Sequence, residues 1–456
     1  MSLFNFKQEA KTYKKAWVIS VNMGYGHERA AYGLRNICEG GDYIVANDYK
    51  GIPREERKSW QTSRKLYEAV SLLKPIPIIG NLAFGIMDKI QEIPPFYPRR
   101  DLSQPNLQLN ETFQFIKKHH IGKELVDRLS ASKEPLPIVS TFFIPAFAAE
   151  LYDYPGEIYC VICDADFSRA WVSPDAKRSR IKYFAPCARV VERLKLYGVR
   201  EENIYLTGFP IPKEIVGGPE SEIIGHDILE RFCNLDPNGF FRSRYEKVLR
   251  DRFGDAVMKY KTAKRPLTLT FSVGGAGAQR QLGIDIIKSL REKIKRRQIH
   301  INLVAGTKVG LASYFIKELH KIGLQRNHGH GIDILAERNR PEYFKKFTAL
   351  LRKTDILWTK PSELSFYTGA GLPIIMAPTI GSQEEFNRVW LQQVGGGIDQ
   401  LDPRYTNEWL FDWISSGALA RLAWNGYVEA PTHGTHRIEQ IITGEKIKLE
   451  QPPLAV

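Results

Sequence analysis

The sequence lacks long apolar runs, low-complexity stretches and a high cysteine content. No apolar run reaches the roughly 20 residues that a membrane-spanning helix needs, so an integral membrane protein is not expected. The first residues, MSLFNFKQEAKTYKKAW, carry charges throughout and contain no apolar core of a secretory signal. These absences predict a cytoplasmic protein.

The five cysteines are few and odd in number. Cys160 and Cys163 form a C-x-x-C pattern, but it lies in the apolar run Ile158–Cys163, and no second pair follows at zinc spacing. We expect buried thiols that behave as small apolar side chains. No metal site is predicted from them.

What the sequence does contain is an ordinary globular composition with an excess of positive charge. Hydrophobic residues make up 43% of the chain and charged residues 25%, which is typical of a soluble globular protein. Its 456 residues exceed one ordinary core, so two domains of roughly 200 residues are expected. The net charge of +14 favours anionic partners. Nucleic acid is not expected among them, since no aromatic-basic motif of a known module is recognisable.

The first strand–turn–helix unit carries a histidine. Residues 16–21 form a short β-rich run, and Gly24 and Gly26 directly afterwards permit a tight turn and close backbone approach. His27 follows at the strand-to-helix turn, where an imidazole can face a cleft with a titratable nitrogen. The alternative is a histidine that caps its own helix.

Further apolar runs extend this unit into a doubly wound sheet. The expected strands of the first domain lie at 16–21, 43–46, 138–143, 158–163, 183–185 and 203–210. The strand at 158–163 leads into the polar-aromatic loop Asp164–Pro174, at the same sheet edge as His27.

A second strand–glycine loop–helix unit begins at Leu267 and offers backbone N–H groups to a phosphate. Later, two polar loops follow the predicted strands 355–358 and 372–377. Because the ends of such strands meet at one sheet edge, where ligands bind in open α/β sheets, we expect a site there. The polar residues are Lys360, Ser362 and Glu363 in the first loop and Gln383, Glu384 and Asn387 in the second.

These patterns divide the chain into four parts. We predict a Rossmann-like domain at 1–214, a helical linker at 215–264, a second Rossmann-like domain at 265–420, and a helical tail at 421–456 that crosses back to the first domain. Residues 60–100 alternate apolar side chains with proline and glycine and are flanked by lysine and arginine. They fit either a positively rimmed segment that dips into an anionic membrane or helices packed on the sheet beside a proline loop.

Taken in order, the motifs resemble the GT-B glycosyltransferases. The chain looks most like the family that holds bacterial MurG and the diacylglycerol galactosyl- and glucosyltransferases of plants and bacteria (glycosyltransferase family 28-like). The similar stretches, spread over roughly residues 16–400, are Gly24–Ala30, Cys163–Pro174, Val199–Pro210, Ser272–Gly277, Gly306–Thr307, Thr359–Pro361, Gly371–Ile375 and Gln383–Asn387.

The resemblance implies two Rossmann-like domains that face a central cleft, with a nucleotide-sugar donor on the second and an acceptor hydroxyl on the first. His27 is then the candidate base. Asp164 or Asp166 orients the imidazole or acts instead, unless both aspartates cap their own loop. No cofactor and no required metal are implied, and the Asp164-Ala-Asp166 spacing is interpreted as accidental rather than as a metal motif.

The remaining roles implied by the resemblance concern the donor. The leaving diphosphate is stabilised by backbone N–H groups of the glycine loop and of the helix starting near Ser362, with Lys360 or Arg29 as the cation. Gln383, Glu384 and Asn387 accept hydrogen bonds from the sugar. The implied donor-binding set is Gly274, Gly275, Gly277, Thr307, Lys360, Ser362, Glu363, Gln383, Glu384 and Asn387, and the implied acceptor and phosphate loop contains Gly24, Gly26 and Arg29.

One position departs from the family. Phe366 stands where relatives carry a glutamate in the helix after the lysine–proline loop, and Glu363 is the candidate substitute from one turn earlier. The expected function is transfer from a nucleotide-sugar, UDP-sugar in the first instance, to an acceptor that is a membrane lipid, with the enzyme peripheral on the cytoplasmic face. The alternatives are a nucleotide-sugar 2-epimerase of the same fold and a non-catalytic nucleotide-sugar-binding or anion-binding protein.

Overall fold

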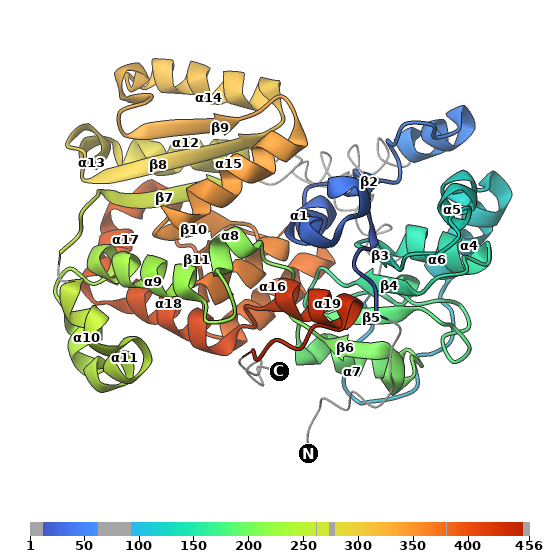
Figure 1. Ribbon diagram of the computed structural model, residues 1–456. Coiled ribbons are helices and arrows are strands. Elements are labelled where there is room, and N and C mark those ends of the chain that lie inside the picture. The colour runs from blue at the N-terminus through green and yellow to red at the C-terminus, as the bar shows by residue number, and fades with distance from the viewer. Residues whose placement is uncertain (1–11, 63–92, 261, 273–278, 380, 450–456) are drawn as a thin grey trace.

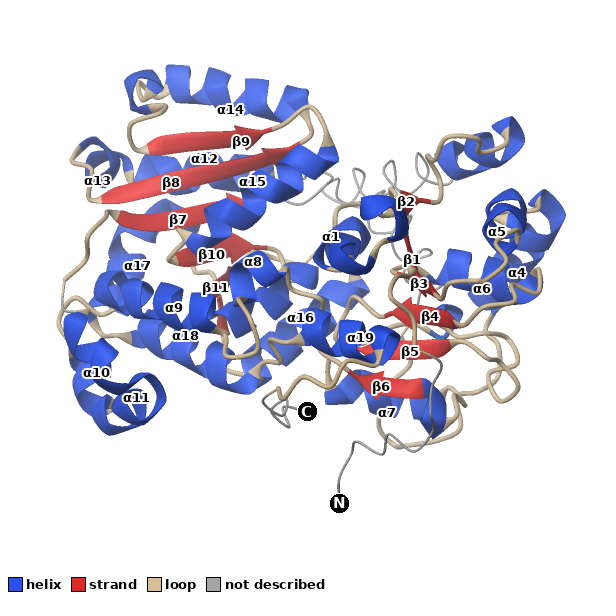
Figure 2. Ribbon diagram, in the orientation of Figure 1, coloured by secondary structure: helices blue, strands red, loops and turns tan. Residues whose placement is uncertain are grey.

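The protein forms two α/β domains in the computed structural model, which describes residues 12–449 apart from 63–92, 261, 273–278 and 380 (Figure 1). Each domain contains a six-stranded parallel sheet flanked by helices (Figure 2). The doubly wound two-domain fold expected from the sequence is confirmed by these two sheets.

The first sheet lies in the N-terminal half of the chain. Its strands are β1 (Trp17–Ser20), β2 (Ile44–Val45), β3 (Ile138–Ser140), β4 (Ile158–Val161), β5 (Lys182–Ala185) and β6 (Ile204–Leu206). Their order is β2-β1-β3-β4-β5-β6. Strands β3 and β4 are buried along their whole length, as expected of parallel strands that are covered on both faces.

Helices join these strands. Residues 54–62 are helical, and the helices with described ends are α1 (Gly26–Gly33), α4 (Leu107–His119), α5 (Lys123–Ser130), α6 (Phe143–Leu151) and α7 (Ala188–Leu196), with 3₁₀ turns η1 (Arg35–Ile37), η2 (Glu39–Gly41), η3 (Arg169–Trp171) and η4 (Glu201–Asn203). Between the two sheets the chain is helical, with α8 (Lys213–Val216), α9 (Glu222–Leu235), α10 (Phe240–Arg244), α11 (Glu246–Phe253) and η5 (Gly254–Lys259).

The second sheet follows. Its strands are β7 (Leu267–Ser272), β8 (Ile299–Gly306), β9 (Ile332–Ala336), β10 (Ile356–Thr359), β11 (Ile374–Met376) and β12 (Gly397–Asp399). They are ordered β12-β11-β10-β7-β8-β9. The connecting elements are α12 (Arg280–Ser289), α13 (Arg291–Lys295), α14 (Val309–Lys321), η6 (Gln325–Asn327), α15 (Arg340–Arg352), η7 (Glu363–Ala370) and α16 (Ser382–Gln393), followed by η8 (Pro403–Tyr405), α17 (Thr406–Ser415), α18 (Ala418–Glu429) and α19 (Gly434–Thr443).

Three details differ from the sequence-based expectations. The helical tail predicted from residue 421 begins earlier, since α18 starts at Ala418, directly after the turn at Gly417 with φ +72°. The segment after Ser362 is a 3₁₀ helix. Strand β12 had no clear sequence signal, since its three residues Gly-Ile-Asp hold only one strand former.

Each sheet has one point at which the strand order reverses, between β1 and β3 in the first and between β7 and β10 in the second. The carboxyl ends of the strands at such a point form the crevice where open α/β sheets bind ligands. The loop after β1 leads to His27, and the loop after β10 leads to Glu363. Both loops therefore occupy the position at which a site is expected.

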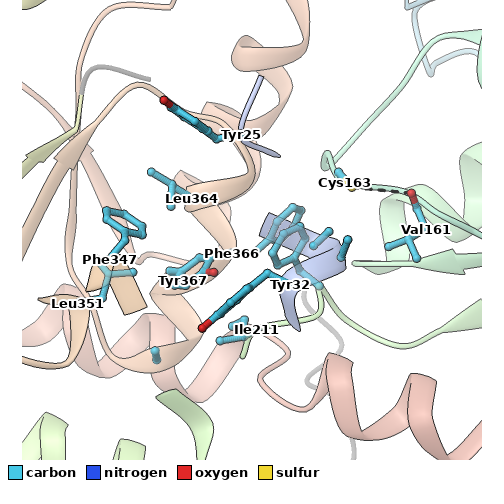
Figure 3. Close-up of a cluster of buried hydrophobic side chains, with 14 of the residues drawn as sticks. Tyr25, Tyr32, Val161, Cys163, Ile211, Phe347, Leu351, Leu364, Phe366 and Tyr367 are labelled. Carbon is cyan, nitrogen blue, oxygen red and sulfur yellow. Dashed lines mark hydrogen bonds between the residues drawn. The ribbon is translucent and has the colours of Figure 1, made fainter. Parts of the chain in front are cut away.

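Aromatic side chains from both domains pack where the domains meet. Phe209 stacks on Phe366 with 5.2 Å between ring centroids, and Tyr32 packs on Phe344 at 5.6 Å. Figure 3 shows Tyr32 beside Phe366 and Tyr367 in this cluster. Phe366 is thus part of the core between the domains.

The last helix, α19, lies against the first domain (Figure 1). The Thr435 hydroxyl donates to the Ile211 carbonyl at 2.6 Å, and Arg437 donates to the Thr207 carbonyl at 3.1 Å. A Cβ at Gly434 would lie only 2.1 Å from the Phe209 carbonyl oxygen, so this close approach requires glycine. Within the described parts of the chain, no helix is both long and apolar enough to cross a membrane.

Candidate functional site

The two reversal points face each other across a boundary that we call the interdomain seam. The seam consists of residues 22–29, 164 and 165 from the first domain and Thr307, Arg340, Tyr343, Glu363 and Asn387 from the second, which hydrogen-bond or pair with one another. Two predicted residues of the first domain, Arg29 and Asp164, are therefore in contact with two of the second, Glu363 and Asn387.

His27 is the second residue of α1 and is half-buried. Its ring lies 4.8 Å from the Phe142 ring and 5.7 Å from the Trp171 ring, measured between centroids. Its Nδ1 is buried and forms no hydrogen bond to any residue that the structure describes. Burial lowers the pKa of His27 to about 4, against the opposing effects of the Glu363 carboxylate and the Thr141 carbonyl. The imidazole is therefore neutral at pH 7 and holds a lone pair that can accept a proton.

The alternative interpretation of His27, a cap for its own helix, is not what the structure shows. Tyr25 occupies the N-cap position of α1, and no side-chain cap hydrogen bond forms there among the described residues.

Arg29 and Glu363 form an ion pair across the seam. Both side chains are nearly inaccessible, with 4% and 12% of their surface exposed. Gly26 makes room for this pair, because a Cβ there would lie 2.9 Å from Glu363 Oε2. Arg29 Nη2 also donates to the Tyr343 hydroxyl at 3.2 Å. Gly24 has φ +121°, a conformation that glycine adopts readily.

Asp164 and Asn387 form the second polar contact across the seam. Asn387 Nδ2 donates to Asp164 Oδ1 at 2.8 Å, and Asn387 Oδ1 accepts from the Ala165 N–H at 2.7 Å. Burial raises the pKa of Asp164 to about 6. Glu363 and Glu384 add to this rise, whereas the hydrogen bond from Asn387 opposes it. Asp164 thus titrates close to neutral pH, as the acids and bases of active sites often do.

Asp166 has different surroundings. Its carboxylate accepts hydrogen bonds from Arg193 at 2.7 and 2.8 Å and from Arg189 at 3.1 Å. Asp166 and Arg193 are almost fully buried. The two aspartates therefore face different partners, and Asp166 belongs to an arginine network inside the first domain.

The polar loops of the second domain meet as expected from neighbouring parallel strands. Lys360, directly after β10, pairs with Glu384 in the first turn of α16. Gln383, in the same turn, is half-buried. Ser362 caps η7, with its hydroxyl accepting from the Leu364 N–H. Thr307 lies in the loop after β8 and contacts Tyr25 of the first domain.

Two sequence-based predictions fall on residues that the structure does not describe. Gly274, Gly275 and Gly277 lie outside the described residues, as does most of the 60–100 segment. In the described ranges, no three His, Cys, Asp or Glu side chains form a group that could hold a metal ion. All five cysteines are buried free thiols, as predicted for Cys160 and Cys163.

Tyr25 and Arg340 are among the seam residues that sequence reasoning missed. Asn339-Arg-Pro-Glu342 carries a recognisable helix-start pattern, with Asn339 accepting from the Glu342 N–H at 3.0 Å. That pattern predicts where α15 begins. It does not tell that Arg340 reaches the first domain, where it contacts Asn22 and Glu28.

No protein-family model matches this chain, and no curated protein matches it in sequence. Among solved structures it is similar to UDP-GlcNAc 2-epimerase from Neisseria meningitidis bound to UDP-GlcNAc, with 11% identity, a TM-score of 0.48, and coverage of 94% of this chain and 98% of that one. It is also similar to S. aureus MnaA in a structure with UDP, with 13% identity, a TM-score of 0.43, and coverage of 96% of this chain and 100% of that one. A third similar structure is Acinetobacter baumannii MurG, with 12% identity, a TM-score of 0.42, and coverage of 94% of this chain and 100% of that one. At this level of similarity the two-domain fold rests on the sheets themselves, and the function rests on the site.

Proposed function

We propose that this protein is a glycosyltransferase that moves a sugar from a nucleotide-sugar, a UDP-sugar, to an acceptor hydroxyl, as in the family that its motifs resemble. The observation that carries the proposal is the meeting of a half-buried, neutral histidine and Arg29 from one sheet's reversal point with the Glu363 carboxylate from the other. Nucleotide-sugar transfer needs a base and a cationic diphosphate site close together.

The proposed reaction uses His27 as the base. The imidazole takes the proton of the acceptor hydroxyl, the acceptor oxygen bonds to the anomeric carbon, and the bond from that carbon to the diphosphate oxygen breaks, with the electron pair leaving on the diphosphate. With a pKa near 4, the His27 ring is unprotonated at every pH above about 5 and is therefore ready to accept the proton. The Glu363 carboxylate, which raises the pKa of His27, stabilises the imidazolium as it forms.

The donor is proposed to bind the second domain. Lys360 and Arg29 supply the cations for the diphosphate, together with N–H groups of the glycine loop at 274–277. Gln383, Glu384 and Asn387 accept hydrogen bonds from the sugar hydroxyls. Since Arg29 and Lys360 are paired with Glu363 and Glu384 in this structure, the diphosphate replaces a carboxylate at each cation.

The acceptor is proposed to be a membrane lipid, and the enzyme to sit peripherally on an anionic membrane surface. Support comes from the sequence of residues 60–100, in which apolar residues alternate with proline and glycine and are flanked by lysine and arginine, and from the net charge of +14.

The central experiment measures binding and turnover separately. Calorimetric titration with UDP is expected to show binding, and a panel of UDP-sugars with extracted lipid is expected to give UDP release. His27→Ala is expected to lower turnover by about 10²–10⁴-fold with UDP affinity retained. His320→Ala, an exposed histidine at the end of α14, serves as the matched control. Unchanged turnover in His27→Ala excludes it as the base, and absence of UDP binding overturns the proposal.

A second candidate, a nucleotide-sugar 2-epimerase, is favoured by a group of three carboxylates in which Glu363 and Glu384 add to the raised pKa of Asp164. Such a group suits proton transfer to and from a sugar carbon. NMR of a UDP-sugar incubated without acceptor separates the two: conversion to a second sugar supports the epimerase, and acceptor-dependent UDP release supports the transferase.

A further inference from the structure

Arg340 of the second domain contacts the segment 22–28, which we call the His27 loop, on both sides of the histidine. Its guanidinium donates to Asn22 Oδ1, five residues before His27, and pairs with Glu28, the residue directly after it. The Glu28 side chain is 1% exposed and that of Arg340 24%, so the carboxylate of this ion pair is buried between the domains while the guanidinium keeps some access to solvent. Arg340 also lies over the Tyr25 ring, 5.5 Å from its centroid.

The Tyr25 side chain packs against the second domain. Its hydroxyl accepts from the Thr307 N–H at 2.8 Å and lies 3.0 Å from the Thr307 hydroxyl. Gly306, with φ +66°, makes room for it, because a Cβ there would be 2.4 Å from the phenol oxygen. The ring packs on Tyr343 with 4.9 Å between centroids. Figure 3 shows Tyr25 on the side of the second domain, near Leu364.

In the first domain, the side chain of Asn47 holds the start of the same loop. Asn47 accepts from the Asn22 N–H at 2.7 Å and donates to the Asn22 carbonyl at 3.3 Å. The glycine at position 24 follows with φ +121° and no atom within 4 Å of a built Cβ. Tyr25 and Glu28, on either side of His27, thus both contact the second domain, and Glu28 Oε2 also accepts from the Tyr43 hydroxyl of the first domain at 3.4 Å.

We propose that Arg340 and Tyr25 are positioning residues that hold the His27 loop in place, so that contact between the two domains determines the position of the candidate base. The role of His27 as base rests on the proposed function. The positioning role of Arg340 and Tyr25 rests on the contacts described above. Neither residue is assigned to touch donor or acceptor.

The surroundings of His27 give this proposal a readout that needs no substrate. The charged group that faces His27 is the Glu363 carboxylate from η7, and the uncharged groups are the Thr141 carbonyl and the rings of Phe142 and Trp171. Burial among them lowers the pKa of His27 to about 4 from an ordinary value of 6.5. If the second domain releases the loop, water reaches the imidazole and the pKa returns towards 6.5.

The experiment is an NMR titration of the full-length chain labelled with ¹³C-histidine, with the His27 resonance assigned from its loss in His27→Gln. In the wild type this resonance is expected to stay unprotonated down to about pH 5. In Arg340→Ala it is expected to titrate between pH 6 and 7. Arg338→Ala, an exposed neighbour, is the matched control and should behave as the wild type, whereas Arg340→Lys should give an intermediate pKa.

Two further variants keep the test decisive if Arg340→Ala does not fold. Tyr25→Phe removes only the oxygen that binds Thr307, and Arg340→Gln removes the charge but keeps hydrogen-bonding groups; each should shift the His27 pKa upwards. A folded variant of this set whose His27 pKa remains near 4 overturns the proposal. If the His27 pKa rises in Arg338→Ala as much as in Arg340→Ala, the proposal is also overturned, since the effect would then not be specific to the contacts of Arg340.

The outcome is separable from that of the proposed function. If UDP does not bind, or if His27→Ala turns over normally, the transferase proposal fails. The NMR result still decides whether Arg340 and Tyr25 position the His27 loop. If transfer is established, the folded Arg340 and Tyr25 variants should lose about tenfold or more in kcat with the KM for the UDP-sugar nearly unchanged. A purely structural role would lower the amount of folded protein and leave the His27 pKa in place.

Discussion

Asp164 and Asp166 stand two residues apart, and replacing each by asparagine is expected to have opposite effects on stability. Burial raises the pKa of Asp164 from 3.8 to about 6. The folded protein therefore binds this proton more tightly than the unfolded chain, and ionisation of Asp164 reduces folding stability as the pH rises from about 4 through 6. Above pH 6 the full cost is present.

The size of this cost follows from the pKa values. A rise from 3.8 to about 6 corresponds to about 3 kcal/mol. Because Asp164 is half-buried, solvent screens part of the effect, and we expect about 1–2 kcal/mol. Asparagine removes the charge and still offers an oxygen to Asn387 Nδ2. Asp164→Asn should therefore stabilise the protein by about 1–2 kcal/mol at pH 8, roughly 2–4 °C in Tm, and by almost nothing at pH 4.

Asp166→Asn is the matched control. It leaves the guanidinium groups of Arg189 and Arg193 without their carboxylate, and Arg193 is fully buried. Breaking a buried ion pair on one side costs about 3–5 kcal/mol, so this variant should be strongly destabilised.

The assay is thermal unfolding of the wild type and both variants at pH 4.5, 6 and 8. A gain in stability for Asp164→Asn that grows with pH, together with lost turnover, identifies a carboxylate kept for function at the expense of stability. The reasoning is refuted if Asp164→Asn is less stable than the wild type at pH 8, or if its difference from the wild type does not change with pH. Tolerance of Asp166→Asn would contradict the buried network.

The remaining predictions concern the C-terminal helix and the membrane. Gly434→Ala should lower the free energy of unfolding by about 2 kcal/mol or more, because its Cβ would lie 2.1 Å from the Phe209 carbonyl oxygen; an unchanged calorimetric melt would show that α19 does not dock this closely. The net charge of +14 should make the protein float with anionic vesicles at low salt and not at about 1 M NaCl, where charges are screened within about 3 Å. Absence of flotation at low salt removes the support for a membrane lipid as acceptor.

The sheets could be predicted from the sequence because buried parallel strands are short apolar runs bounded by glycine and proline. Leu372–Ala377 is such a run, and it contains β11. The loops at the carboxyl ends then follow from topology alone, which places Lys360 and Glu384 together without knowledge of any side chain. Strand β12 could not be predicted, since a three-residue strand with glycine and aspartate depends on its neighbour β11 rather than on its own propensity.

The contacts across the seam could not be predicted in the same way. Arg29 and Glu363 are 334 residues apart, and no periodicity connects them. Asp164 and Asp166 look alike in the sequence, yet one meets an asparagine of the other domain and the other meets two arginines of its own. Which carboxylate is poised to titrate is decided by these partners and by burial, and both are properties of the assembled domains.

Each cation of the proposed donor site is paired with a carboxylate. Arg29 is held by Glu363 and Lys360 by Glu384. A diphosphate that takes over these cations releases two carboxylates at once, and one of them, Glu363, also raises the proton affinity of His27. Freed from Arg29, the full negative charge of Glu363 acts on the imidazole, and the pKa of His27 rises. In the proposed reaction, donor binding therefore makes His27 a stronger base at the moment when an acceptor proton must be taken.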